Sequence, residues 1–123
     1  MATLADRVYD NGLTVLDTEA NRLDITSAEA TTYTEATSTY TLGNATSLSI
    51  GAPADRAGGG REVTVAAISD GTVTATGTAV YYAIVDTVNS RLLATGSLSA
   101  SQSVTSGNSF TLTSVAIGIP DPA

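Results

Sequence analysis

The side chains that could do chemistry in this chain are carboxylates, hydroxyls and tyrosines, because the sequence contains no His, no Cys and no Lys. The commonest metal ligands and general bases are therefore missing, as are the residues needed for a Schiff base. Paired carboxylates can hydrolyse glycosides, and Asp17 with Glu19, or Asp6 with Asp10, are the local candidates. Glycosidases usually line a sugar-binding cleft with aromatic rings, yet the chain has no Trp and one Phe. We therefore expect no enzymatic activity, no catalytic residue and no cofactor.

Metal and phosphate sites are not expected either. No calcium loop of the form Asp-x-Asp-x-Asp-Gly occurs, and the DNG run at residues 10–12 is interpreted as a turn. A phosphate-binding loop opens a helix, whereas the GGGR run at residues 58–61 leads into a predicted strand. The glycine run is therefore interpreted as a flexible loop.

The charge balance limits the partners that the protein can bind. The net charge is −7, and the five basic residues are arginines that form no basic stripe. Nucleic acids and membrane surfaces require clustered cations, so neither is expected as a partner. The chain shows no secretory signal and no apolar run of membrane-spanning length, which favours synthesis and assembly in the cytoplasm.

Arginines and tyrosines are the residues best suited to hold a protein partner. Both types are enriched at interfaces, and Arg binds carboxylates or backbone carbonyls with little flexibility. Alternatively, the arginines are solvated charges and the tyrosines pin irregular segments onto the core; both interpretations stay open. Tyr81 and Tyr82 point to opposite faces of one predicted strand, so at most one fills the core. The candidate interface residues are Arg7, Tyr9, Arg22, Tyr33, Tyr40, Arg56, Arg61 and Tyr81.

The N-terminal third is acidic, and its apolar residues are irregularly spaced. Residues 4–9 and 13–16 are predicted as short extended segments on either side of a turn at Asn11 and Gly12. A helix over residues 2–9 is the alternative. This part of the chain is expected to form an arm that is less regular than the rest.

The next segments are predicted from alternation and glycine content. Residues 22–27 alternate apolar and polar side chains, which predicts a half-buried strand. One helical turn is expected around Glu35, and a short strand at residues 48–50. Residues 51–60 are rich in glycine and are predicted to be an exposed, mobile loop without a regular ladder.

The remainder of the chain has the stronger β-strand pattern. Residues 62–68 and 72–78 flank Asp70 and Gly71, and an Asp-Gly dipeptide between two β-prone segments predicts a hairpin. Residues 79–86 are the most apolar segment and are predicted to be a central strand with both faces covered.

The last predicted elements follow a second hairpin. Residues 91–98 are expected to pair with the central strand, and residues 99–108 to form a polar link. A strand is predicted at residues 109–113, and the apolar pattern shifts after Ser114, as a bulge or a change of neighbouring strand requires.

Several short strands separated by turns predict an all-β fold. We expect one small β-sandwich, Ig-like or jelly-roll-like, or a partly open barrel. The expected organisation is a single domain, with an acidic arm and first strands over residues 1–50, the loop over residues 51–60 and the sandwich body over residues 61–123.

Four segments carry a resemblance that extends over most of the chain. They are residues 5–13 (ADRVYDNGL), 32–37 (TYTEAT), 94–96 (ATG) and 99–109. In these segments the chain resembles small virion-associated structural proteins of tailed bacteriophages and prophages. The resemblance implies a structural component of a phage particle, located in the virion and assembled in the bacterial cytoplasm.

The function that we expect is a capsid decoration or cement protein, which binds and stabilises the assembled head without enzymatic chemistry. Its expected partners are the major capsid protein and copies of itself, in a trimer for example. The alternatives are a tail, baseplate or fibre accessory protein, and a carbohydrate-binding module for host attachment that stacks sugars on Tyr81 or Tyr82.

Overall fold

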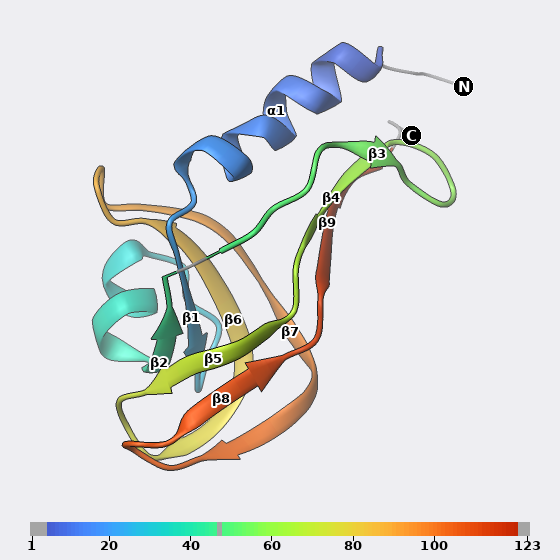
Figure 1. Cartoon of the computed structure of the whole chain (residues 1–123). Coiled ribbons are helices and arrows are strands. Elements are labelled where there is room, and N and C mark those ends of the chain that lie inside the picture. Colours follow the sequence, from blue (N-terminus) through green and yellow to red (C-terminus); the bar gives the residue numbers. More distant parts are fainter. Residues whose placement is uncertain (1–4, 47, 121–123) are drawn as a thin grey trace. The chain divides into compact units, whose positions relative to one another are not determined.

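The chain folds mainly into β-strands, which confirms the all-β class expected from the sequence. The computed structural model describes residues 5–46 and 48–120. Within them, the strands form a six-stranded and a three-stranded sheet, and every pairing is antiparallel. The larger sheet curls into a half barrel, which corresponds to the partly open barrel among the expected architectures (Figure 1).

The six-stranded sheet, sheet A, consists in spatial order of β7 (Arg91–Val104), β6 (Gly77–Asp86), β1 (Arg22–Thr26), β2 (Thr41–Ala45), β5 (Ile68–Val73) and β8 (Ser109–Leu112). β6 pairs with β1 and β7, and its second half is buried, as predicted for a central strand. The hairpin between β6 and β7 is also confirmed. The two edge strands meet where the Gln102 side-chain amide donates a hydrogen bond to the Thr111 carbonyl, at 2.8 Å.

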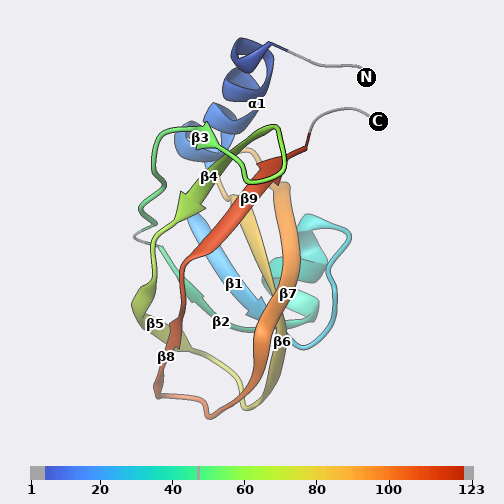
Figure 2. The same cartoon turned by 90° about the vertical axis from the view of Figure 1, so that its right-hand side faces the viewer.

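The smaller sheet, sheet B, has the order β3 (Ala54–Asp55), β4 (Arg61–Val65) and β9 (Val115–Ile119), as Figure 2 shows. The helix α1 (Asp6–Glu19) packs on β4. Val63 and Val65 are fully buried in β4, which gives this small sheet its apolar side.

The described residues divide into two compact units. Unit 1 contains α1 and sheet B, from residues 5–19, 49–67 and 113–120. Unit 2 contains sheet A and the π-helix η1 (Glu35–Thr39), from residues 20–48 and 68–112. Each unit combines segments that are distant in the sequence. The three-part division expected from the sequence follows chain order and stays a prediction.

The extended segments predicted at residues 4–9 and 13–16 were wrong, because both lie in α1 over the residues described. Tyr9, Leu13 and Leu16 are buried and recur at helical spacing, i, i+4 and i+7. The Asn-Gly pair that suggested a turn lies on the exposed side of the helix, where glycine costs only about 1 kcal/mol. The helical alternative over residues 2–9 was closer, although residues 2–4 lie outside the described part.

The hairpin predicted around Asp70 and Gly71 is also wrong, since both residues lie inside β5. β4 pairs with β9, and β5 pairs with β8, so the two segments never face each other. Gly71 is needed because the ring of Phe110 lies where a Cβ would stand. The dipeptide therefore marks a close packing contact and not a turn.

Three smaller predictions changed in the C-terminal and middle segments. The polar link predicted at residues 99–108 is largely strand, because β7 continues to Val104. The strand predicted at residues 48–50 is reduced to a bridge between Ile50 and Val65, with residue 47 outside the described part. Residues 51–60 are mostly exposed as expected, yet β3 forms a short ladder there.

Other predictions of this kind are confirmed. β1 and the helical turn around Glu35 lie where they were predicted, although β1 is buried on both faces and not half-buried, since Asp24 and Thr26 are buried as well. The shift of the apolar pattern after Ser114 also has a structural counterpart, because β8 belongs to sheet A and β9 to sheet B.

Candidate interaction surfaces

Arg61 joins α1, β3 and β4 within unit 1. Its Nε donates to Asp10 Oδ1 at 2.9 Å, and its Nη1 donates to Asp55 Oδ1 at 2.7 Å. Asp6 lies further away, at 3.9 Å, and the Pro53 carbonyl accepts a bond from Nη2. These contacts, with Asp10 first, raise the pKa of Arg61 above its ordinary value. The guanidinium therefore stays charged and holds the helix against the sheet.

The Arg61 cluster includes one of the candidate carboxylate pairs, Asp6 and Asp10. Asp6 and Asp10 both lie within ion-pair distance of Arg61, at 3.9 Å and 2.9 Å, so both carboxylates face this cation. Asp17 is exposed on α1, and Glu19 is half-buried. Neither pair lines the polar pocket of unit 2 that is described below.

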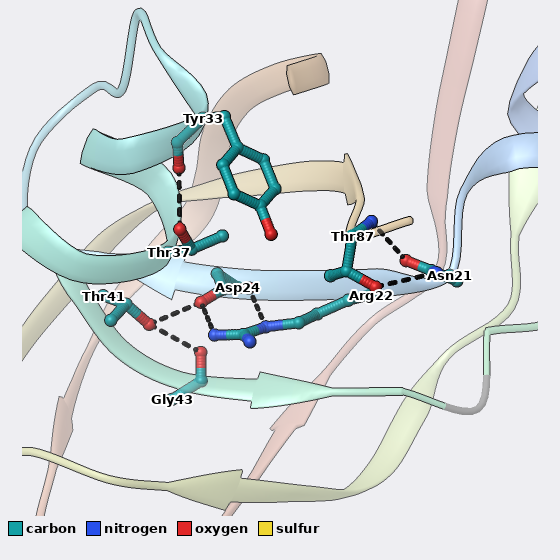
Figure 3. A network of polar contacts seen from close by, with 8 residues as sticks. All are labelled: Asn21, Arg22, Asp24, Tyr33, Thr37, Thr41, Gly43 and Thr87. Atoms are coloured by element: carbon teal, nitrogen blue, oxygen red, sulfur yellow. Dashed lines mark hydrogen bonds and ion pairs between the residues drawn. The ribbon is translucent and has the colours of Figure 1, made fainter. Parts of the chain in front are cut away.

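A second ion pair is buried in unit 2, at the start of β1 (Figure 3). Arg22 binds Asp24 through two bonds, Nε to Oδ1 at 2.6 Å and Nη2 to Oδ2 at 2.8 Å. The Thr41 hydroxyl donates to the same carboxylate at 2.6 Å. The Asp24 side chain has no exposed surface, whereas 24% of the Arg22 side chain is exposed. The hydrogen bond that Arg22 donates to Asp24 is the main cause that raises the pKa of Arg22, so the guanidinium stays charged.

Tyr33 and Tyr40 flank η1 and are half-buried. Both pack on a small cluster of Ala30, Ala36, Ala83 and Val85, together with Leu92 of β7. Figure 3 shows the Tyr33 ring above the Arg22–Asp24 pair. The two tyrosines therefore attach the π-helix to sheet A, and only part of each ring is available to a partner.

Glu35 fixes the entry to this π-helix. Its Oε1 accepts hydrogen bonds from the Thr31 backbone amide at 2.9 Å and the Thr31 hydroxyl at 2.7 Å. The Thr31 hydroxyl is the main cause that lowers the pKa of Glu35. The carboxylate is thus held within its own segment.

The sequence reasoning missed a further structural carboxylate, Asp86 at the end of β6. It accepts bonds from the backbone amides of Val88 and Asn89 and from the Asn89 side chain at 2.8 Å. The Asn89 side chain is the first cause that lowers the pKa of Asp86. The turn also holds Ser90 at a positive φ of 54°. An Asp followed by Asn in a four-residue connection was the available signal.

The remaining interface candidates differ in how accessible they are. Arg7 is exposed on α1, and Tyr81 is half-buried on β6. Tyr9 is 1% exposed, so its ring is inside the protein and not at a surface. Arg56 donates to the Gly59 carbonyl at 3.1 Å, and its side chain crosses the face of Gly118. The structure therefore brings Tyr33 close to Arg22 in unit 2, and Tyr40 packs on the same apolar cluster as Tyr33.

One small polar pocket lies in unit 2, at the ends of β2 and β5. It is lined by Asn44, Ala45, Thr46, Asp70 and Thr72. Its amide, carboxylate and hydroxyl groups can hydrogen-bond a small polar ligand such as a sugar hydroxyl. Over residues 5–46 and 48–120, no group of three or more acidic, His or Cys side chains could hold a metal ion, and no helix is long and apolar enough to cross a membrane.

Comparisons with known proteins return no match. No family model fits the chain, and no curated protein and no solved structure is significantly similar to it.

Proposed function

We propose that this protein is a non-enzymatic structural component of a bacteriophage virion, and that it decorates the capsid. It binds the assembled shell of the major capsid protein through protein–protein contacts. A ligand that binds only the assembled state shifts the equilibrium toward that state, so binding stabilises the shell. The phage setting rests on the sequence resemblance of the four segments described above. The decoration role rests on how the chain uses its charged groups.

The observation that carries the proposal is that these buried and half-buried charged groups are each held by partners within the protein. Asp24 has Arg22, Asp86 has its own turn, and Arg61 has Asp10 and Asp55. Groups that are held in this way stabilise a fixed shape and are not free to move protons or bind a substrate. A protein that binds the shell over a large contact surface requires a rigid shape and exposed polar strands.

The structure changes which residues are candidates for the contact. α1 is packed on β4 and does not extend as a free arm, so deleting it would remove Tyr9 and Leu13 from the apolar core of unit 1 and disrupt that unit. Arg7, which is exposed on α1, and the exposed part of residues 51–60 are better candidates. On the proposed function, these two regions face the shell.

The test is to locate the protein in purified particles and to measure its binding to shells that lack it. We expect density over the capsid lattice in electron cryo-microscopy, in copy numbers that match a lattice position. Arg7→Glu should weaken binding to the shells, while the control Ala100→Glu, at an exposed position of β7, should not. A few copies at the neck or tail would support the tail alternative, and absence from the particle would refute a virion role.

The carbohydrate-binding alternative is favoured by a single observation, the polar pocket beside Asp70. The aromatic platform expected for it is weakened, since Tyr82 is only 7% exposed. Binding on a glycan array that is lost in Asp70→Ala would favour this alternative over decoration.

A further inference from the structure

The outer edge of sheet B is open and uncharged. β9 pairs with β4 on one side, and in the described residues no backbone bond joins its other side to another strand. Its sequence, VAIGI, contains neither a charged residue nor a proline. Natural edge strands are usually protected by Lys, by Pro or by a bulge, because unpaired edges attract other strands.

The register shows which peptide groups face this open edge. The Thr64 carbonyl accepts a bond from the Gly51 amide at 3.1 Å, so the peptide groups of Thr64 point away from β9. In an antiparallel ladder, the backbone N–H and C=O groups of two opposite residues either point toward each other or point away from each other. Ala116 lies opposite Thr64, so its N–H and C=O point to the open side, and so do those of Gly118. Gly118 is confirmed independently. The Arg56 amide donates to the Gly60 carbonyl at 3.1 Å, so the peptide groups of Glu62, which lies opposite Gly118, point toward β3 and away from β9.

The side chains of β9 form two distinct faces. Val115, Ile117 and Ile119 share one face, and the Cδ1 of Ile119 lies 3.6 Å from where a Cβ on Gly12 would stand. This face therefore lies on the side of α1. Ala116 and Gly118 form the other face, and the Arg56 side chain crosses this face at Gly118.

The apolar surface continues from β9 onto α1. Val8 is 55% exposed, Val15 is 38% exposed, and Ile119 is 36% exposed. Gly12 lies between the two valines on the helix surface, four residues after Val8 and three before Val15, and it is also next to Ile119. None of these residues carries a charge.

We propose that β9 pairs antiparallel with β9 of a second copy of this chain, about a two-fold axis through Ile117. The strand nearly repeats itself when reversed, with a β-branched residue at each end and in the middle and small residues between them. Reversal thus places Val115 opposite Ile119 of the second copy on one face. On the other face it places Ala116 opposite Gly118.

This register uses the outward peptide groups fully. Ala116 and Gly118 of the two copies exchange both of their backbone bonds, which is the hydrogen-bonded pair of an antiparallel ladder. A C2 interface must be complementary to itself, and β9 meets this condition because its sequence nearly repeats when reversed. Each chain carries a net charge of −7, so two copies repel unless they meet where carboxylates are absent, as along β9. The pairing is independent of the proposed function.

The experiment measures the mass of the full chain by light scattering and sedimentation over a range of concentrations. The expected species is a dimer that dissociates on dilution. Ala116→Pro removes an outward donor without removing a bond to β4, and it should weaken dimerisation by about tenfold or more. Ala116→Lys should do the same, because it places a cation beside Arg56 of the second copy, which lies over Gly118. Ala100→Lys, on the exposed edge strand β7, is the matched control and should leave the mass unchanged.

Amide hydrogen exchange gives a second readout that needs no variant. The Ile117 amide belongs to the ladder with β4 and should be protected at every concentration. The amides of Ala116 and Gly118 should become protected only where the dimer forms. A monomer at all concentrations, a closed trimer, a dimer unaffected by Ala116→Lys, or protection of these two amides in dilute monomer would each overturn the proposal.

Discussion

Removing one partner of the Arg22–Asp24 pair should destabilise the protein far more than removing one partner of the Arg61–Asp55 pair. The Asp24 side chain has no exposed surface, whereas 91% of the Asp55 side chain is exposed. A carboxylate that loses its cation at the surface is solvated by water, but a buried one is left uncompensated. We expect Arg22→Met to lower the free energy of unfolding by about 3–4 kcal/mol, and Asp55→Ala by about 0–1 kcal/mol.

The upper limit of the Arg22→Met effect can be worked out, because the stranded carboxylate can take up a proton instead. Placing a proton at pH 7 on a carboxyl group of ordinary pKa, about 3.9, costs about 4 kcal/mol, and at pH 5 it costs about 1.5 kcal/mol. The folded variant then binds a proton that the unfolded chain does not, so its stability rises as the pH falls. The gap to the wild type should therefore shrink by about 2–3 kcal/mol between pH 7 and pH 5.

The assay is urea unfolding followed by circular dichroism, at both pH values, for the wild type, Arg22→Met, Asp55→Ala and the double variant Arg22→Met/Asp24→Leu. The double variant should regain most of the loss, because apolar side chains of similar size can replace a buried pair. The reasoning is refuted if Arg22→Met and Asp55→Ala cost the same, or if the gap between Arg22→Met and the wild type is equal at pH 7 and pH 5.

Three further outcomes are expected. Thr26→Val should raise the free energy of unfolding by about 0.5–2 kcal/mol, because the Thr26 hydroxyl is buried without a hydrogen-bond partner; a loss in the urea midpoint would contradict this. Gly71→Ala should cost about 1–3 kcal/mol, because its Cβ overlaps the Phe110 ring, and Phe110→Leu in the same chain should reduce that cost in a double-mutant cycle. Burial raises the pKa of Tyr82, so the stability that it contributes is present below pH about 10 and lost as the pH rises further. The melting temperature of Tyr82→Phe should therefore decrease less with rising pH, above about pH 10, than the melting temperature of the wild type.

Much of sheet A could be predicted because its strands carry local signals. The alternation at β1, the apolar run at β6 and the turn that follows it depend on neighbouring residues, and these elements lie where they were predicted. The shift of pattern after Ser114 was likewise visible, because moving to another sheet changes which residues are buried.

The interaction sites were less predictable. Arg22 and Arg61 were chosen for their residue type, but their partners differ in distance along the chain. Asp24 is two residues from Arg22, whereas Asp10 is separated from Arg61 by 51 positions. Nothing in local spacing indicates the second contact. The open edge of β9 was also invisible from the sequence, since an edge is defined by the strand that is missing beside it.

The amino-acid sequence by itself determined the all-β class and the acidic net charge, with arginine as the only basic residue. It also determined the positions of the strands with strong alternation. These properties follow from residue types and their near neighbours. Only the tertiary structure decided that residues 6–19 form a helix, since Tyr9, Leu13 and Leu16 gain more from burial on one helix face than a turn at Gly12 would gain locally. It also decided that β4 pairs with β9 and not with β5. Strand partners are chosen by packing between distant segments, as the Phe110 ring over Gly71 illustrates, and no local pattern contains that information.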